Sequence, residues 1–277
     1  MSFAVMMVHV DLEGFDARVR LAANLARRFS STLIGVSAAL VEEDRVAIKT
    51  LLDRREEAFR CFARDAGLKL DWRSANDLPD DFVAREARAA DLLIIGRASA
   101  PGGVTRAVDP GRAVLRAGRP ALIVPPDVEV LRAERVVVAW KDSREARRAV
   151  VDALPLLHEA KQVSVVEIQD IDGDVRAQRR VDDVAQYLMR HGIAAGSRVL
   201  AQDGRKSADA LIDVAQKDGA DLIVAGAYGQ SRLGEWVFGG VTRDLLSACP
   251  VCCLLACLSL AVRSREPPAP IPQAHMY

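Results

Sequence analysis

Short apolar runs alternate with amphipathic stretches along the whole chain. In the second half, residues 135–141 form a β-branched run, and Ala146, Val150, Ala153 and Leu157 follow at spacings of four, three and four residues. Residues at those spacings lie on one face of a helix. The segment therefore predicts a strand followed by an amphipathic helix that packs on a sheet.

The same alternation fills the rest of both halves. In the second half, further strands are expected near residues 163–168, 195–200, 221–225 and 251–255. In the first half, strands are expected near residues 3–9, 32–37 and 121–124. Strands that alternate with helices favour a parallel sheet with right-handed crossovers and helices on both faces.

The two halves repeat each other. Residues 90–96 match residues 220–226 at an offset of 130, and residues 8–11 match residues 139–142 at an offset of 131. An offset held this closely over most of the unit indicates a duplication. The predicted fold class is therefore α/β, with two tandem flavodoxin-like or Rossmann-like domains. Each is expected to be a five-stranded parallel sheet with helices on both faces.

Composition shifts mark the expected domain boundaries. We expect a first domain at residues 1–126, a linker at 127–134, a second domain at 135–257 and a C-terminal tail at 258–277. The tail contains a proline-rich stretch, which is typical of extended or disordered chain.

The overall charge gives no global attraction to nucleic acid or to an anionic membrane, and a local basic patch stays open. Lys plus Arg and Asp plus Glu number 38 each, so the chain has no net field that would draw such a partner. The longest nearly unbroken apolar run, residues 251–262, is shorter than the roughly 18 to 20 residues that span a bilayer. The N-terminus lacks the features of a signal peptide. These observations predict a cytoplasmic protein.

Four of the five cysteines cluster near the C-terminus. Cys252 and Cys253 lie in the predicted strand 251–255. Neighbouring strand residues point to opposite faces of a sheet, so these two thiols are badly placed to share one metal ion. We therefore expect core packing and no metal site.

A glycine-rich loop follows the fourth predicted strand of the second half. Gly226 and Gly229 come directly after residues 221–225. In an open parallel sheet, ligands bind beyond the carboxyl ends of the strands, where the strand order reverses. Glycine there lets the backbone approach a ligand closely. The loop is the candidate binding site.

The far end of this loop predicts an anion site. Gly239 and Gly240 precede a predicted helix whose first amides, near Val241 and Thr242, have no partner within the helix. The positive end of a helix dipole and its free amides favour a phosphate. Arg232, within the loop, is placed to offset phosphate charge.

The loop resembles the nucleotide-binding motif of the universal stress protein family. That motif is a glycine, two residues, a second glycine, nine residues and a third glycine, and Gly226, Gly229 and Gly239 match it. The resemblance extends over both halves and nearly the whole chain. It implies a stress-response protein whose loop wraps the ribose and phosphates of ATP or AMP, with Mg²⁺ carried by the phosphates.

The resemblance also implies contacts from two other strand ends. An aspartate after the first strand of the family domain contacts the nucleoside, which here becomes Asp142. Backbone at the end of the second strand meets adenine, which here becomes a residue from Val166 to Ile168. Asp142 is also well placed to cap the helix that follows it, and both roles stay open at this stage.

Two positions depart from the family pattern. Gly240 stands where the family has Ser or Thr, so one hydroxyl to phosphate is missing. Trp140 stands where many nucleotide-binding members have a smaller residue. Its indole either stacks on adenine or fills the pocket.

The first half is expected to lack the site. Aligned without gaps, Ser99 replaces the second glycine, and Asp109 and Pro110 replace Gly239 and Gly240. An acid at the phosphate position repels an anionic ligand. We therefore expect one adenine-nucleotide site, in the second domain.

No catalytic constellation emerges from the sequence. The four histidines are scattered, and neither a G-x-x-x-x-G-K-[ST] loop nor a G-x-S-x-G turn is present. The leading hypothesis is a regulatory protein without enzymatic activity that binds an adenine nucleotide and a protein partner. The alternatives are an interaction scaffold without a ligand, and slow ATP hydrolysis or self-phosphorylation at Ser231 or Thr242.

The closing strands of the two halves predict how the halves assemble. Residues 121–124 and 251–255 are expected at sheet edges, and exposed edges tend to be paired. Family members dimerise through this edge, so we expect an internal pseudo-dimer within one chain. A homodimer of whole chains stays open.

Overall fold

The computed structural model describes residues 2–12, 17–41, 44–64, 67–97, 107–169, 175–201, 204–229 and 240–258. The first half contains β1 (Val5–His9), α1 (Ala17–Phe29), β2 (Thr32–Ala38), α2 (Arg45–Arg64), β3 (Leu70–Ala75), α3 (Pro79–Glu86), η1 (Ala87–Ala89), β4 (Leu92–Gly96), α4 (Pro110–Ala117) and β5 (Ala121–Val124). The second half contains β6 (Arg135–Ala139), α5 (Arg144–Leu157), β7 (Gln162–Gln169), α6 (Val175–Arg190), β8 (Ala195–Ala201), α7 (Ser207–Asp218), β9 (Leu222–Gly226), α8 (Gly240–Ala248) and β10 (Cys252–Ala256).

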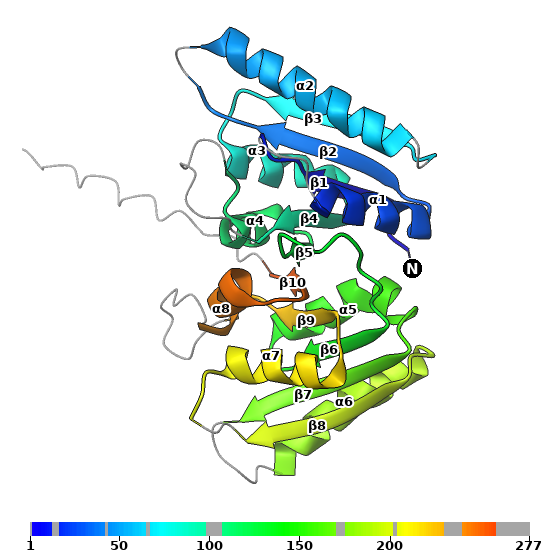
Figure 1. Cartoon of the computed structure of the whole chain (residues 1–277). Helices are drawn as coiled ribbons and strands as arrows, with labels where there is room; N and C mark the ends of the chain where they lie inside the picture. The colour runs from blue at the N-terminus through cyan, green and yellow to red at the C-terminus, as the bar shows by residue number, and fades with distance from the viewer. Residues whose placement is uncertain are drawn as a thin grey trace, which may run out of the picture.

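All the strands join one ten-stranded sheet in the order β3-β2-β1-β4-β5-β10-β9-β6-β7-β8 (Figure 1). Within each half every pairing is parallel, whereas β5 and β10 pair antiparallel at the junction, with Ile123 opposite Cys253. The predicted pairing of the halves through their closing strands is confirmed. Two five-stranded parallel sheets therefore become one continuous sheet.

The strand register fixes how the halves align. Met6 of β1 pairs with Leu92 of β4. Val136 of β6 pairs with Leu222 of β9. Both pairs are related by an offset of 130, so the offset of 131 expected for the first strands is wrong by one residue. The sequence match aligned an aspartate that both halves share, whereas the pairing of the strands gives the offset without regard to residue type.

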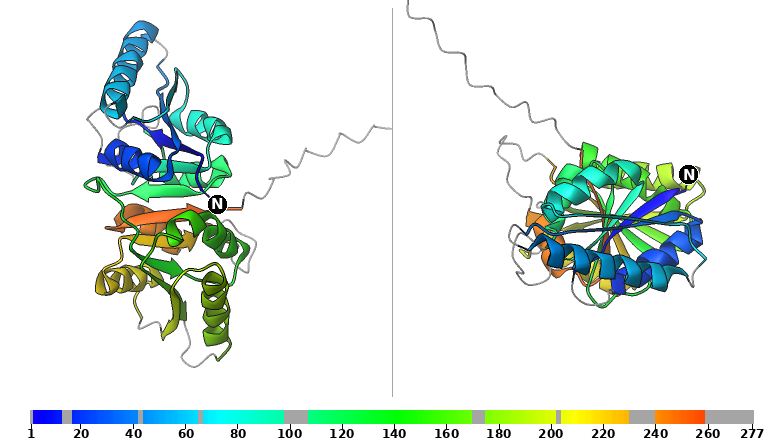
Figure 2. Two further views of the ribbon diagram at one scale, coloured as in Figure 1. Left: turned by 90° about the vertical axis from the view of Figure 1, so that its right-hand side faces the viewer. Right: turned by 90° about the horizontal axis from the view of Figure 1, so that it is seen from above.

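Helices cover both faces of the sheet, as the right-hand view of Figure 2 shows. One core cluster contains buried residues of α1, α2, α5 and α6, and the other contains buried residues of α3, α4, α7 and α8. Cys252 belongs to the first cluster and Cys253 to the second. The expected separation of these two thiols onto opposite faces is thus confirmed, and the described residues contain no group of three or more metal-ligating side chains.

Aspartates at corresponding places tie the strand ends together. Asp91 accepts hydrogen bonds of 2.8 and 3.0 Å from two backbone amides just before and at the start of β1. Asp221, 130 residues later, accepts bonds of 3.0 and 2.9 Å from two amides ahead of β6. In each half, an aspartate just before the fourth strand thus holds the segment that leads into the first strand, although the amides it binds, Ala4 and Val5 against Arg132 and Ala133, are not at corresponding positions.

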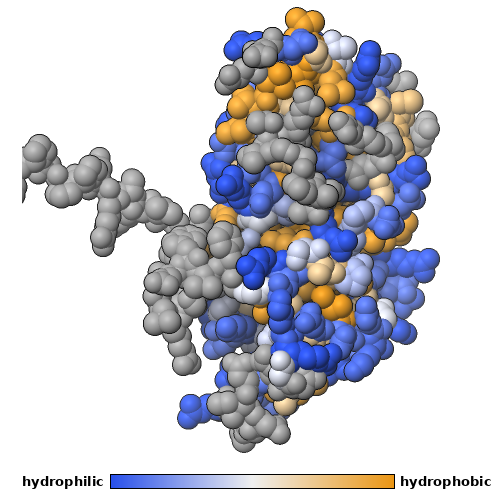
Figure 3. All heavy atoms as spheres, turned by 60° about the vertical axis from the view of Figure 1, so that its left-hand side comes forward, coloured by the Kyte–Doolittle hydropathy of each residue, from blue (hydrophilic) through white to orange (hydrophobic). Residues whose placement is uncertain are grey.

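The far end of the first half carries a small separate apolar cluster beneath α2. It contains Leu12, Ala39, Ile48 and Leu52, and Val46 beside it is 78% exposed. Figure 3 shows apolar atoms gathered at this end of the molecule. Among the described helices, none is both long and apolar enough to cross a membrane.

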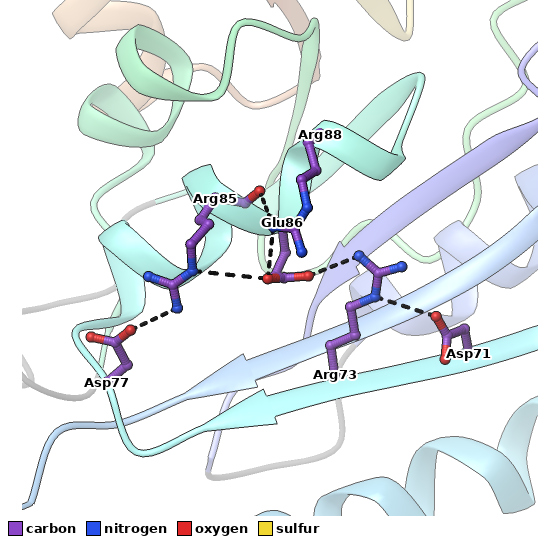
Figure 4. A network of polar contacts seen from close by, with 6 residues as sticks. All are labelled: Asp71, Arg73, Asp77, Arg85, Glu86 and Arg88. Carbon is purple, nitrogen blue, oxygen red and sulfur yellow. Dashed lines mark hydrogen bonds and ion pairs between the residues drawn. The ribbon is translucent and has the colours of Figure 1, made fainter.

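A network of charges joins β3 to α3 and η1 in the first half (Figure 4). Glu86 is buried, and its carboxylate forms ion pairs with Arg73 at 2.8 Å, Arg88 at 3.0 Å and Arg85 at 3.9 Å. Arg85 also pairs with Asp77 at 2.7 Å. Because one buried carboxylate faces three guanidinium groups, its charge is needed to hold them in place.

We expect Glu86→Gln to lower the free energy of unfolding by about 1–2 kcal/mol, because the arginines lose their shared counter-charge. Asp53→Asn is the matched control, since Asp53 pairs with Lys49 on the exposed surface. That change should cost less than about 0.5 kcal/mol. Urea denaturation of both variants measures the difference. Equal effects would show that the Glu86 network contributes no more than a surface pair.

Candidate functional site

The strand order of the second half reverses between β6 and β9. From β6 the chain moves outward through β7 and β8, then returns to the other side of β6 as β9. Ala139 pairs with Ala225 at the carboxyl ends of these two strands. Trp140 and Gly226 follow at the same edge of the sheet, where an open parallel sheet binds its ligands. The candidate site lies here.

Gly226 is crowded by protein backbone. A Cβ atom at this position would lie 2.6 Å from the carbonyl carbon of Glu145 and even closer to the amide nitrogen of Ala146. Both atoms belong to the first turn of α5. The sequence assigned this glycine to close approach of a ligand. The structure shows that it permits close packing of β9 against α5.

Gly229 faces the same helix turn through side chains. A Cβ atom there would lie 3.3 Å from the Glu145 carboxylate and 3.8 Å from the Ser143 hydroxyl. Ser143 caps α5 by accepting a hydrogen bond of 3.2 Å from the Ala146 amide. Glu145 is only 3% exposed, and Arg144 lies 3.3 Å from its carboxylate. The acid that faces the loop is therefore Glu145.

Sequence reasoning missed Ser143 and Glu145. A cap signal was available, because a serine three residues before Ala146 is typical of a helix start. Such a cap places the following residues in the first helical turn, directly against the loop after β9. The pattern does not reveal which side of that turn faces the glycines.

Asp142 lies on the solvent side of the helix start. Its carboxylate is exposed and pairs with Arg147 of α5. The strand register also makes Lys141, and not Asp142, the counterpart of Asp11 in the first half. The helix-capping role weighed for Asp142 belongs to Ser143. The predicted nucleoside contact of Asp142 stays a prediction.

Val166 is fully engaged in the sheet. Its side chain is completely buried, and its carbonyl oxygen accepts a hydrogen bond of 2.8 Å from the Trp140 amide. Strand residues two apart direct their backbone groups to the same side. Ile168, which is half-buried, therefore directs its backbone past the end of β6. Within the predicted range, Ile168 is better placed than Val166 to meet a base.

Trp140 is part of the core. It is 9% exposed and shares its apolar cluster with Ala146 and Val150 of α5. Its indole nitrogen has no hydrogen-bond partner among the described residues, although buried indoles usually find one. Of the two roles expected for this residue, filling space against α5 fits this burial better than stacking on a free base.

The start of α8 is open around its first residue. A Cβ atom at Gly240 would have no neighbour within 4 Å among the described residues, and Gly240 itself is exposed. Val241 is half-buried. Thr242 is buried, and its hydroxyl accepts a hydrogen bond of 3.4 Å from the Tyr228 amide. This hydrogen bond therefore joins the residues just after β9 to the first turn of α8. Arg232 and Gly239 lie outside the described residues.

Tyr228 links the loop to the first half. Its φ of 56° is in the left-handed region, unusual for a residue other than glycine. Its hydroxyl lies against Gly111 of α4, where a Cβ atom would collide with it. Burial, and then the charge of Asp109, raises the pKa of Tyr228 to about 12. A change in the loop therefore acts on α4 directly.

In the first half, an arginine side chain covers the strand end that corresponds to Gly226. Arg18 is 4% exposed and lies 2.5 Å from the Asp11 carboxylate. Its guanidinium covers Gly96, the counterpart of Gly226, with Cζ 3.0 Å from where a Cβ atom would be. His9 is buried 3.3 Å from Asp11, and burial lowers its pKa to about 4. A cationic side chain of the protein therefore covers this strand end.

The ungapped alignment of the two loops is confirmed by their helices. Helix α4 begins at Pro110 and α8 begins at Gly240, again 130 residues apart. Asp109 caps α4 by accepting a hydrogen bond of 2.8 Å from the Arg112 amide. A side-chain cap thus uses one amide that would otherwise be available to an anion.

Comparison with known proteins agrees with this architecture. The universal stress protein family model matches residues 133–256. A universal stress protein from Archaeoglobus fulgidus DSM 4304 shares the fold at a TM-score of 0.72 and 16% identity, over 91% of this chain and 98% of that one. A protein of unknown function from Pseudomonas aeruginosa PAO1 does so at a TM-score of 0.60 and 15% identity, over 92% of each chain. No curated protein sequence matches the chain. The second half of the chain thus matches the model of the universal stress protein family, and the chain as a whole shares its α/β fold with a solved universal stress protein.

Proposed function

We propose that the second domain binds an adenine nucleotide, ATP or AMP, and that the chain acts in the stress response as a regulator with little or no turnover. The observation that carries the proposal is the open start of α8 at Gly240, at the switch point of the sheet. The cytoplasmic location, the protein partner and a homodimer of chains stay predictions.

The phosphates would bind at the start of α8. This helix spans nine residues, and its first amides carry the positive end of the helix dipole. Among the described residues, space is open around Gly240. At the corresponding place in the first half, α4 begins at Pro110 and the side chain of Asp109 caps it. The asymmetry supports a single site per chain.

The nucleoside would lie between the loop and the end of β7. The backbone of Ile168 is directed to this side of the sheet and offers hydrogen bonds to a base. The Glu145 carboxylate beside Gly229 accepts hydrogen bonds but repels phosphate, so it suits ribose hydroxyls. The site thus separates an acidic part near α5 from a positive part at α8.

A Mg²⁺ ion fits this arrangement only as a companion of the phosphates. The described residues hold no group of three or more His, Cys, Asp or Glu side chains that would bind a metal ion alone. Glu145 is the carboxylate nearest Gly229, and Mg²⁺ typically takes one or two carboxylates together with phosphate oxygens. Because Glu145 faces the ribose end of the proposed site, the phosphate oxygens would hold the ion, and its charge would offset that of the phosphates.

Low turnover is proposed because the two described hydroxyls near the site, those of Ser143 and Thr242, already accept hydrogen bonds; Ser231 lies outside the described residues. Ser143 accepts from the Ala146 amide, and Thr242 accepts from the Tyr228 amide. A nucleophile needs a free hydroxyl and a base to activate it. Tyr228 instead connects the loop to α4, so nucleotide occupancy would be transmitted to the first half.

An interaction scaffold without a ligand is the second candidate. The burial of Trp140 in the core at the end of β6 favours it, because an indole that fills the base pocket leaves no room for adenine. The two candidates are distinguished by calorimetry. The nucleotide-binding regulator gives measurable heat on addition of nucleotide, and the scaffold gives none.

Calorimetric titration of the full chain with ATP and with AMP tests the proposal. We expect binding in the wild type and at least a tenfold loss of affinity, about 1.4 kcal/mol, in Gly229→Asp, which places a second carboxylate beside Glu145. Ser99→Asp makes the same change at the repeat-related position and should leave the affinity unchanged. No heat at millimolar nucleotide, or equal binding by Gly229→Asp, would refute the proposal.

A further inference from the structure

Helices α4 and α8 pack against each other across the junction of the two halves (Figure 1). Gly111, in the first turn of α4, is buried at this contact. A Cβ atom at Gly111 would collide with the Tyr228 hydroxyl and would lie 3.5 Å from Cδ1 of Leu246 in α8. Among residues other than proline, glycine is the least favourable in a helix. Its place in α4 is therefore explained by the space that Tyr228 and Leu246 need.

Arg97 of the first half reaches the carboxyl end of α8. Its backbone is fixed at the sheet, because the Arg97 amide donates a hydrogen bond of 2.8 Å to the carbonyl oxygen of Val124 at the end of β5. Its guanidinium donates a hydrogen bond of 2.8 Å to the carbonyl oxygen of Cys249, directly after α8. The last carbonyls of a helix lack partners within the helix and carry the negative end of its dipole. A cation at this place therefore stabilises the end of α8.

These contacts are not repeated in the opposite direction. At the offset of 130 residues between the halves, Ala227 is the counterpart of Arg97, and Ala98 is the counterpart of Tyr228. An alanine side chain can neither donate a hydrogen bond to a carbonyl nor reach across the junction as a tyrosine ring does. The segment from β9 to the end of α8 therefore receives a support that the related residues cannot give to the segment from β4 to the end of α4.

We infer that Arg97 and Gly111 of the first half are positioning residues for the nucleotide site of the second half. The inference rests on the proposed function, in which the first amides of α8 bind the phosphates. Arg97 fixes the far end of this helix, and Gly111 fixes its side together with Tyr228, whose amide donates to the Thr242 hydroxyl in the first turn. A binding group is effective when the elements around it hold its direction. The first half therefore orients the phosphate-binding amides without contacting the ligand.

Arg97→Ala in the full chain tests the role of the guanidinium, by hydrogen–deuterium exchange and by titration with ATP. Without nucleotide, the α8 amides should exchange about tenfold faster than in the wild type, because the end of the helix loses its partner. The affinity for ATP should fall about fivefold to tenfold. Arg97→Lys keeps the charge and should restore part of both losses. Arg119→Ala is the matched control, since Arg119 donates to the Arg88 carbonyl within the first half, and it should change neither.

Gly111→Ala tests the contact between α4 and the loop after β9. Alanine is otherwise favourable in a helix, but here its methyl group would displace the Tyr228 ring. We expect the affinity for ATP to fall about fivefold. Tyr228→Phe removes the hydroxyl that collides with the methyl group, so the double variant should bind ATP more tightly than Gly111→Ala alone. Such a rescue shows direct coupling of the two positions, which a general loss of stability does not produce.

The outcomes separate this inference from the proposed function. If the wild type binds ATP and Arg97→Ala binds it equally well, the inference is overturned and the proposed function stands, even if α8 exchanges faster. If Arg97→Ala fails to fold, Gly111→Ala decides, and an affinity for ATP equal to that of the wild type overturns the inference. If the wild type itself binds no nucleotide, the proposed function is wrong and the inference falls with it.

Discussion

Replacing Gly226 with alanine is expected to lower the free energy of unfolding by about 3 kcal/mol. The added methyl group would lie 2.6 Å from the carbonyl carbon of Glu145 and closer to the Ala146 amide. These are backbone atoms in the first turn of α5, so no side-chain rotation relieves the collision. Either β9 moves away from the helix or the capped turn opens.

Gly240→Ala is the matched control for this prediction. In the part of the chain that the structure describes, a Cβ atom at Gly240 meets nothing within 4 Å, and the φ of Gly240 is not in the left-handed region. Alanine in the first turn of α8 should therefore be neutral or stabilise by up to about 1 kcal/mol. Urea unfolding of both variants measures the contrast. If Gly226→Ala proved as stable as Gly240→Ala, the close packing of β9 on α5 would be wrong.

Trp140→Ala should lower the free energy of unfolding by about 3–5 kcal/mol. The indole is 9% exposed within the core cluster that includes Ala146 and Val150, so its removal leaves a cavity. Trp140→Phe keeps most of the volume and deletes the indole nitrogen, which has no partner among the described residues. We expect that change to cost less than about 1.5 kcal/mol.

The same two variants decide what the indole does for a ligand. If the indole only fills space beside the pocket, Trp140→Phe binds ATP as tightly as the wild type, which is the result we expect. If the indole stacks on adenine, the smaller ring should weaken binding measurably. Chemical denaturation and calorimetry on one preparation give both answers. A small effect of Trp140→Ala on stability would contradict the burial of this residue.

The fold was predictable because the signals that define it are periodic. The alternation of strands and helices follows from spacing, and the pairing of the closing strands follows from their exposed edges and the family resemblance; the sheet confirms both. Separation of Cys252 from Cys253 also follows from spacing alone, since a strand repeats every two residues. The offset between the first strands of the two halves was harder to predict, because an aspartate shared by both halves suggests an alignment that is shifted by one residue.

The side chains of the site were less predictable because they depend on packing across elements. Gly226 predicts space for a ligand, yet the backbone of α5 occupies that space. Arg18 looks like an ordinary helix residue, yet its guanidinium fills the crevice of the first half. Glu145 faces Gly229 because of the helix start at Ser143. Each of these depends on the angle at which a helix crosses the sheet, which periodicity does not encode.

Native mass spectrometry of the full chain with ATP tests the central claim most directly, because it counts nucleotides on each chain. The account predicts one nucleotide per chain, lost in Gly229→Asp, since among the described residues the start of α8 is open at Gly240 whereas Asp109 caps α4. A second bound nucleotide would mean that Arg18 does not close the first crevice. If no nucleotide binds to the chain at millimolar ATP, the proposed site in the second half is wrong.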